Sequence, residues 1–308
     1  MAETLTRPAS VATPERILQR LDWQIIRKLD GILQGDYRSL FHGFGLDFAD
    51  LREYQPGDDI RYIDWNVTAR MNTPYVREYL EDREISAWFL LDVSPSVDFG
   101  TTQTFKRDVL IDFTTILARL LTRHGNRVGA ILYDGKQHKI IPAHGGRIQV
   151  LRLVNDLFKM PHLPRAPFTD LAALLQIAFN TIRRRSLIFI VSDFISAPGW
   201  EKLLGLLSQR HEVIAIRIYD PRETELPDVG PLFLEDAETG EQLYIDTGDR
   251  NFRERFQAVN ESREAELRAA FHHASVDELS LSTEDNLIHA VIRFAAMRKQ
   301  RKRQLRRQ

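Results

Sequence analysis

The sequence predicts an α/β fold, with a doubly wound, mostly parallel sheet that carries helices on both faces. Two observations support this prediction. Strand-sized runs of unbroken apolar residues recur between residues 85 and 220, and segments with helical periodicity separate them. Strands that are buried on both faces are apolar along their whole length, so this alternation is typical of a parallel sheet covered by helices.

The N-terminal part of the chain, residues 1–84, is predicted to be an elaboration of one helix and short strands, packed on the core. A polar stretch is followed, from Thr13, by a run with apolar residues at helical spacing as far as Leu33. Residues 37–84 are interrupted by Gly and Asp, which favours loops and short strands.

A charged series surrounds Trp65 in this part of the chain. Its members are Asp58, Asp59, Arg61, Asp64 and Arg70. The series is either a partner-binding surface or an ion-pair network that holds the N-terminal region on the sheet. A large ring among these charges would remove them from water and require them to be paired. We therefore favour the structural interpretation, with Trp65 packed among its neighbours.

The predicted core, residues 85–297, contains the sheet. Its predicted strands cover residues 85–93, 126–134, 186–194, 212–220 and 275–282. Its predicted helices cover residues 103–123, 147–158, 170–184, 199–209 and 250–274. Residues 231–246 indicate a β-hairpin that turns at Thr239-Gly240. A final helix is predicted to begin near residue 284 and to continue into a basic tail.

Composition and motifs exclude several classes of site. The 308 residues include no Cys, which removes disulfides, Cys-ligated metals and thiol nucleophiles. The nine His lack His-Glu-x-x-His spacing, and neither a Gly-x-Ser-x-Gly elbow nor a P-loop occurs. No apolar run approaches the roughly 18 residues of a membrane-spanning helix, and the first residues lack the apolar region of a signal peptide. We expect a cytoplasmic protein without an integral membrane segment.

Charge is unevenly distributed along the chain. Residues 298–308 hold seven basic side chains and no acidic one, which leaves 35 basic and 43 acidic groups, a net charge of −8, in residues 1–297. A basic tail can bind nucleic acid or anionic lipid through counterion release. Because it has no interleaved aromatic residues and no nucleic-acid-binding motif accompanies it, we favour a solvated helix end.

Oxygen-bearing side chains follow two predicted strands and precede one predicted helix. An Asp-x-Ser-x-Ser pattern ends the first core strand, a Ser-Asp pair ends the third, and a Thr-Asp pair opens the helix at 170–184. Loops after neighbouring parallel strands meet at one edge of a sheet. We therefore expect five side chains to converge: Asp92, Ser94, Ser96, Thr169 and Asp193.

The chemistry of this set suits a small divalent cation. Mg²⁺ takes about six oxygen ligands and usually keeps some of them as water. Hydroxyls and two carboxylates would leave a coordination position that a carboxylate from another molecule can fill. A simpler interpretation stays open, because Ser, Thr and Asp are also preferred at helix N-caps and turns; Thr169 would cap the helix that follows it even without a cation.

The pattern resembles the metal-ion-dependent adhesion site of von Willebrand factor A domains. Residues 45–84 resemble the signature of the bacterial family called domain of unknown function 58, which carries a von Willebrand factor A-like domain and is commonly encoded beside MoxR-type AAA+ ATPases. The resemblance implies that Ser94, Ser96 and Thr169 bind Mg²⁺ (or Mn²⁺) directly. It implies that Asp92 and Asp193 act mainly through water.

This resemblance implies a protein-binding module that is not an enzyme. The expected role is an adaptor or co-chaperone of a MoxR-type AAA+ ATPase, in which the metal accepts an Asp or Glu from the ATPase or its client. An Mg²⁺-dependent phosphoesterase is an alternative, since Asp and Mg²⁺ can also clamp a phosphate, but the sequence offers no nucleophile or base apart from the ligands. Nucleic-acid binding through the tail is a further alternative that we do not favour.

Overall fold

The computed structural model describes most of the predicted core and parts of the N-terminal region. The described residues are 13–21, 51–77 except 57, 59, 61, 62 and 72, 86–161 except 102 and 103, 169–235, and 240–296 except 295.

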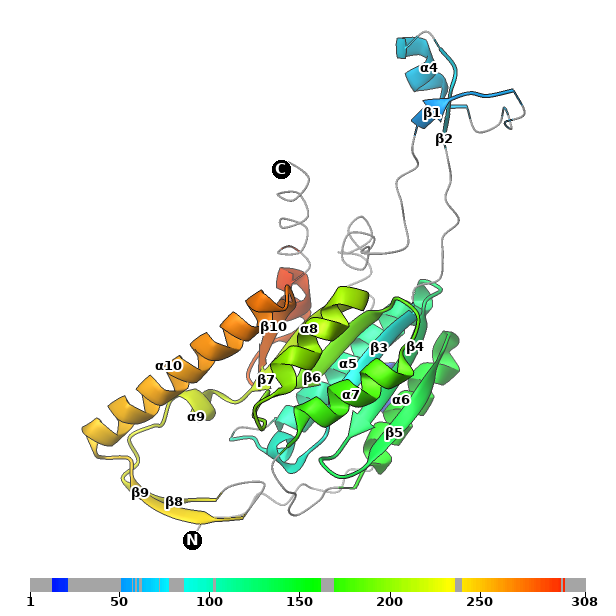
Figure 1. The fold of residues 1–308 in the computed structure, drawn as a ribbon. Helices are drawn as coiled ribbons and strands as arrows, with labels where there is room; N and C mark the ends of the chain where they lie inside the picture. Colours follow the sequence, from blue (N-terminus) through cyan, green and yellow to red (C-terminus); the bar gives the residue numbers. More distant parts are fainter. Residues whose placement is uncertain are drawn as a thin grey trace.

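A six-stranded sheet forms the centre of the core, with the strand order β10-β7-β6-β3-β4-β5 (Figure 1). The strands are β3 (Ser86–Asp92), β4 (Arg127–Tyr133), β5 (His138–His144), β6 (Leu187–Ser192), β7 (Glu212–Tyr219) and β10 (Asp277–Ser282). Neighbouring strands are parallel except for β4 and β5. The predicted fold class is confirmed, and each of the five predicted core strands is present within two residues of its predicted limits.

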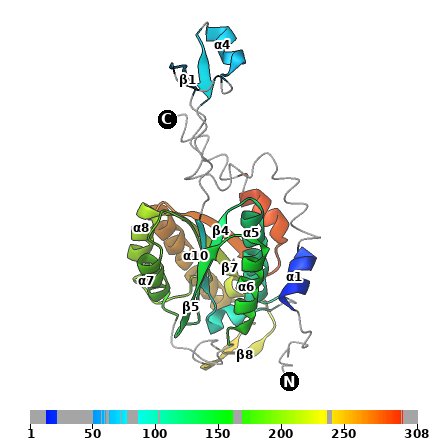
Figure 2. The same cartoon turned by 90° about the vertical axis from the view of Figure 1, so that its right-hand side faces the viewer.

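Helices cover both faces of the sheet, as Figure 2 shows from the side. One face carries α1 (Pro14–Leu21), α5 (Lys106–Arg123), α6 (Gly146–Lys159) and the helical residues 287–294. The other carries α7 (Leu171–Thr181), α8 (Trp200–Arg210) and the C-terminal part of α10 (Arg250–His273). The central strand serves both faces, because Phe89 and Leu91 belong to one apolar cluster and Leu90 to the other. This two-sided burial explains why β3 is apolar along its length.

The order of the strands determines where a ligand site can form. From β3 the chain passes through α5 to β4, which lies on one side, and it later returns through α7 to β6 on the opposite side of β3. The carboxyl ends of β3 and β6 therefore flank the point at which the winding direction reverses. Ligands of open α/β sheets bind in the crevice at such a point.

The edge strand β5 was not predicted from the sequence. It runs antiparallel to β4 with an irregular register between Val128 and Ala130, and of its seven residues only Ile141 is fully buried. It also contains Pro142, which is tolerated in edge strands because one side of the strand lacks a hydrogen-bonding partner. A polar, Pro-containing run lacks the apolar pattern on which the strand predictions depended.

The N-terminal region contains α1, β1 (Leu51–Glu53), α4 (Trp65–Met71) and β2 (Tyr75–Arg77), with β1 and β2 antiparallel. The predicted helix and short strands are present, although the helix is described only as far as Leu21. Leu18 and Leu21 are buried in the core between α5 and α6.

The charged series around Trp65 gives a mixed result. Asp58 accepts two hydrogen bonds from the Arg52 guanidinium, each 2.7 Å long, and these bonds lower its pKa to about 2. Asp64 accepts from the backbone N–H of Val67 and caps α4. Both contacts are local to residues 51–77, so they show a structural role for these two acids within this region, and the expected anchoring of the region on the sheet stays a prediction. The expected packing of Trp65 is wrong, since 68% of this residue is exposed. Asp59 and Arg61 lie outside the described residues.

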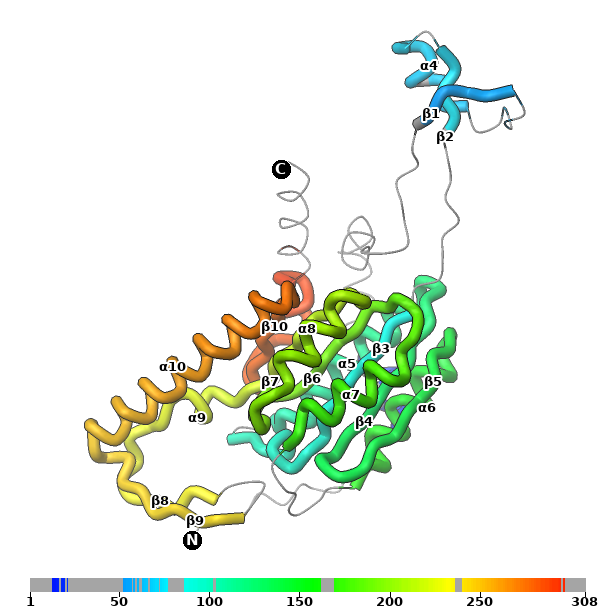
Figure 3. The backbone as a smooth tube through the Cα atoms, viewed as in Figure 1, coloured from blue at the N-terminus to red at the C-terminus, as the bar shows by residue number. Residues whose placement is uncertain are grey.

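Three smaller elements complete the described core. They are the 3-10 helix η3 (Pro95–Asp98), the one-turn helix α9 (Pro221–Thr224) and the hairpin of β8 (Pro231–Glu235) and β9 (Gln242–Asp246). The hairpin was predicted, whereas α9 was not. The tube in Figure 3 follows the chain from β7 through α9 to the hairpin and back along α10 to the sheet. None of the described helices is long and apolar enough to cross a membrane, and the basic tail at 298–308 lies outside the described residues.

Candidate functional site

The end of β3 places the first carboxylate of the candidate site. Asp92 is fully buried. Its Oδ1 accepts a hydrogen bond from the backbone N–H of Ser94 at 3.1 Å, and its Oδ2 accepts one from the Ser192 hydroxyl at 2.7 Å. Because Ser192 is the last residue of β6, the second bond joins the carboxyl ends of two neighbouring strands.

The two serines of the Asp-x-Ser-x-Ser pattern lie side by side. The Oγ atoms of Ser94 and Ser96 are 3.0 Å apart and share a hydrogen bond, and both residues are buried. Ser94 precedes η3, yet its side chain makes no capping hydrogen bond, so helix capping does not explain its presence. Two oxygens at adjacent octahedral positions of one Mg²⁺, each about 2.1 Å from the ion, are about 3.0 Å apart. The observed spacing suits two ligands of one cation.

The loop after β6 places the second carboxylate. Asp193 is 3% exposed, and its Oδ1 accepts the backbone N–H of Ile195 at 2.9 Å. The next residue, Phe194, has a φ of 57°, which is unfavourable for a residue with a side chain. Its ring is held between Trp200 and Phe271, at centroid distances of 5.7 and 5.0 Å. Aromatic packing therefore stabilises a backbone turn that orients Asp193.

The loop before α7 is anchored to the same region. The backbone carbonyl of Thr169 accepts hydrogen bonds from the Ser196 hydroxyl at 2.9 Å and from the Ala197 N–H at 3.1 Å. Thr169 is buried, but it is not the N-cap of α7 as we expected. Asp170 has that role, and its side chain accepts from the Ala173 N–H. The side chain of Thr169 is thus not required for capping.

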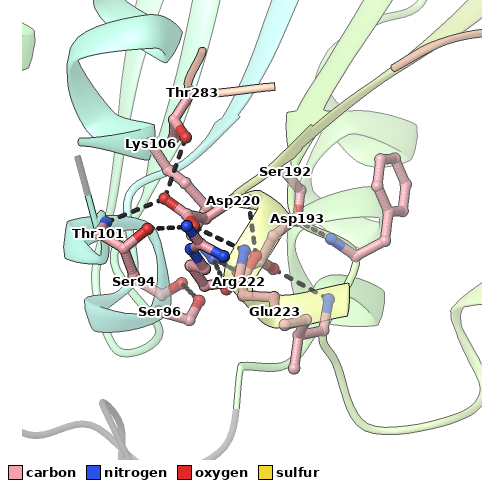
Figure 4. Close-up of polar contacts among 12 residues, drawn as sticks. Ser94, Ser96, Thr101, Lys106, Ser192, Asp193, Asp220, Arg222, Glu223 and Thr283 are labelled. Atoms are coloured by element: carbon pink, nitrogen blue, oxygen red, sulfur yellow. Dashed lines mark hydrogen bonds and ion pairs between the residues drawn. The ribbon is translucent and has the colours of Figure 1, made fainter. Parts of the chain in front are cut away.

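A lysine that the sequence analysis did not single out contacts one carboxylate of the site (Figure 4). Lys106, the first residue of α5, is fully buried. Its ammonium group lies 2.8 Å from Oδ2 of Asp193 and 2.6 Å from Oε1 of Glu223. The attraction of these two carboxylates outweighs desolvation and raises the pKa of Lys106, so the side chain is charged. Sequence offers little signal for it, because α5 begins 14 residues after Asp92 and its partner Glu223 lies on the unpredicted helix α9.

Helix α9 is held by a further buried carboxylate. Asp220, at its N-terminus, accepts hydrogen bonds from the hydroxyl and N–H of Thr101, the Arg222 N–H and the Thr283 hydroxyl. Desolvation opposes ionisation of Asp220, but these donors outweigh it and lower its pKa. Glu223 accepts the Asp220 N–H with its Oε2 at 2.9 Å. This reciprocal capping fixes Glu223 facing Lys106.

Electrostatics at the site favour an additional cation. Burial is the main cause that raises the pKa of Asp92 to about 6, and repulsion by the Asp193 carboxylate adds to it. Hydrogen bonds from Ser94 and Ser192 act in the opposite direction but do not compensate. A positive charge near both carboxylates would relieve this repulsion.

The donor set fits a small divalent ion bound through few protein atoms. Among the described residues, no three His, Asp or Glu side chains form a metal-ligand cluster, so hydroxyl ligands would be essential. Each oxygen of Asp92 and Asp193 accepts a hydrogen bond from the protein, and a carboxylate oxygen can accept two. These carboxylates are therefore suited to accept hydrogen bonds from metal-bound water.

Comparison with known proteins identifies the family. The sequence profile described as "Protein of unknown function DUF58" matches residues 50–266. Proteins named Rv1480, from Mycobacterium tuberculosis, and Mb1516, from Mycobacterium bovis, are each 36% identical over 284 residues, which cover 92% of this chain and 89% of each relative.

Solved structures with a similar backbone include BatB from Bacteroides thetaiotaomicron and the VWA domain of SpRpn10. BatB is 12% identical with a TM-score of 0.46, and the match covers 70% of this chain and 99% of BatB. The SpRpn10 domain is 14% identical with a TM-score of 0.37, and the match covers 68% and 94%. The profile match over more than half of the sequence, together with the mycobacterial relatives, shows that this chain belongs to the DUF58 family.

Proposed function

We propose that this protein is a non-enzymatic, metal-dependent protein-interaction module. Ser94, Ser96 and Thr169 would hold Mg²⁺ or Mn²⁺ directly, and Asp92 and Asp193 would hold it through water. When bound, the ion supplies a positive centre with a coordination position for an outside carboxylate. The protein itself orients the hydroxyls, buries the two acids and limits the access of bulk water.

The arrangement of these side chains carries the proposal. Two hydroxyl oxygens lie 3.0 Å apart beside two buried carboxylates, and the pKa of Asp92 is raised to about 6. A purely structural turn does not require like charges to be buried near each other, since burying an acid without sufficient compensation is unfavourable. A cation-binding role accounts for both features.

The proposed ligand is an Asp or Glu of a partner protein. Like the metal, this partner remains a prediction, and we propose a MoxR-type AAA+ ATPase or its client, met in the cytoplasm. Lys106 already forms ion pairs with two carboxylates of this chain. We therefore propose that the partner's carboxylate binds the metal and not this lysine.

Metal binding is tested by thermal unfolding of the full chain with increasing Mg²⁺ or Mn²⁺. The wild type is expected to gain stability with ion concentration, because an ion that binds only the folded state stabilises it. Ser94→Ala/Ser96→Ala should show no gain. Ser186→Ala is a matched control, because this serine is buried at the opposite end of β6 and donates to the Arg184 carbonyl. Equal gains in the wild type and the double variant would exclude the proposed site.

Partner binding is tested with a purified MoxR-type ATPase from the same organism, in the presence of Mg²⁺ or of a chelator. Binding that disappears with the chelator and with Ser94→Ala/Ser96→Ala supports the adaptor role. Hydrolysis of phosphoester substrates that is lost in Asp92→Ala would instead support the phosphoesterase alternative.

A further inference from the structure

The candidate site contains a positive charge of the protein's own. The Lys106 ammonium is completely buried and contacts Asp193, one of the two carboxylates assigned to the divalent ion. Its other carboxylate partner, Glu223, is on α9 and takes no part in the proposed ion coordination. Figure 4 shows Lys106 between Asp193 and Glu223.

We propose that Lys106 competes with the divalent cation for Asp193, and that Glu223 on α9 sets how strongly it competes. The inference rests on the proposed metal-binding function and adds a regulating element to it. Lys106 is a positioning residue, because it acts on the ion through Asp193.

The competition follows from charge and burial. Asp193 is 3% exposed, so its charge is weakly screened by solvent. The nearby ammonium partly neutralises it and reduces its attraction for a second cation. Glu223 opposes this effect, because its carboxylate lies 2.6 Å from Nζ and neutralises part of the lysine charge. Loss of the Glu223 charge would leave Asp193 as the main partner of the ammonium.

The position of α9 therefore affects the affinity of the site. Glu223 is held in place by the Asp220 N–H, and Asp220 is held in turn by Thr101 and Thr283. The Thr101 contact links α9 to the loop that precedes α5, and the Thr283 contact links it to the end of β10. A partner that displaces α9 would change the surroundings of Lys106 and hence ion binding. By reciprocity, ion binding would change the affinity for that partner by the same factor.

The test measures Mn²⁺ binding to the full chain by isothermal titration calorimetry. It uses one variant that should raise the affinity for Mn²⁺ and one that should lower it. Lys106→Met removes the competing charge and should tighten Mn²⁺ binding by about tenfold, a factor typical of coupled sites. Glu223→Gln keeps the bond to the Asp220 N–H but loses the ion pair, and it should weaken binding by about fivefold. In the Lys106→Met background, Glu223→Gln should have a smaller effect, because it acts through the lysine.

Two matched controls make the same chemical changes elsewhere. Lys139→Met removes a lysine that pairs with Asp156 at 2.9 Å, and Glu254→Gln removes the partner of Arg250. Both should bind Mn²⁺ like the wild type. Lys106→Met leaves two carboxylates without their cation and is expected to be less stable without metal, so circular dichroism should verify its fold. Glu223→Gln retains the Lys106–Asp193 pair and tests the inference even if Lys106→Met does not fold.

The outcomes separate this inference from the proposed function. If the wild type binds Mn²⁺ and Ser94→Ala/Ser96→Ala does not, the metal site stands. If a folded Lys106→Met then binds no more tightly than the wild type, the competition by Lys106 is refuted and the metal site is unaffected. If Glu223→Gln binds as tightly as the wild type, the control of that competition by Glu223 is refuted. If the wild type itself binds no Mn²⁺, the proposed function fails and this inference fails with it.

Discussion

Asp92→Asn is expected to stabilise the metal-free protein, although it removes a charged residue that makes two hydrogen bonds. The pKa of Asp92 rises from 3.8 to about 6 on folding, so the ionised carboxylate is less favourable in the folded protein than in the unfolded chain. At about 1.4 kcal/mol for each factor of ten in the acid constant, ionisation at neutral pH costs about 3 kcal/mol. The substitution removes this cost.

Part of that gain is lost through hydrogen bonding. The side-chain oxygen of the Asp92→Asn variant can still accept the Ser94 N–H, but the new amide group would face the Ser192 hydroxyl, which now donates to Asp92 and accepts from the Phe194 N–H. Reorienting this hydroxyl costs about 1 kcal/mol. The net prediction is a gain of about 2 kcal/mol in the free energy of unfolding.

The assay is urea unfolding at neutral pH in the presence of a chelator. Because the folded pKa is raised, the cost is absent below pH ~4 and complete above pH ~6, so the advantage of the variant should shrink as the pH falls through this range. With excess Mg²⁺ the order should reverse if the ion binds, since only the wild type keeps the second carboxylate for the ion.

Asp134→Asn is a matched control for this prediction. Asp134 is also a buried Asp after a core strand, but its Oδ1 accepts the N–H groups of Lys136 and Gln137 at 2.8 and 2.7 Å. Its neutralisation should give no gain, because charge-assisted hydrogen bonds are weakened. A chelator-treated Asp92→Asn protein no more stable than the wild type would refute the electrostatic reasoning.

Three further predictions concern stability and can be checked by equilibrium unfolding. Phe194→Gly should be more stable than Phe194→Ala by about 0.5–1 kcal/mol, although both lose about 3 kcal/mol or more of ring packing, because φ is 57° at this position; the reverse order would contradict the backbone geometry. Gly129→Ala should cost about 1–3 kcal/mol, since the new Cβ would lie 2.9 Å from two atoms of the Trp88 ring, and an unchanged midpoint would show that the ring moves away easily. Burial is the main cause that lowers the pKa of His211, with the charges of Arg210 and Arg185 adding to it, so the folded protein takes up this proton at lower pH than the unfolded chain does. The wild type should therefore lose stability as the pH falls below about 6.5, and His211→Leu should lose less; parallel pH profiles would be inconsistent with a buried neutral imidazole.

Much of the fold followed from local patterns. Four of the five predicted core strands, β3, β4, β6 and β7, each have at least four successive residues that helices or other strands bury, and this burial is visible in the sequence as an apolar run. The edge strand β5 and the one-turn helix α9 were missed because neither carries an apolar period: β5 is mostly exposed, and α9 has four residues, none of them fully buried. Trp65 shows the converse error, because an aromatic residue among charges was expected to be packed and is 68% exposed.

The sequence by itself identified the hydroxyl and carboxylate residues of the candidate site, because their positions at strand ends predict both the chemistry and the edge of the sheet where they occur. Only the tertiary structure decided the charge balance within the site. Lys106 reaches Asp193 across 87 residues of sequence and Glu223 across 117. Burial of these groups depends on how α5 and α9 come together in the fold. The capping box of α9, Asp220-x-x-Glu223, is a local pattern, but the contact of Glu223 with Lys106 is not encoded in it. Electrostatic energy depends on distance and solvent exposure in three dimensions. A sequence motif can therefore identify the charged groups but not the strength of the interactions between them.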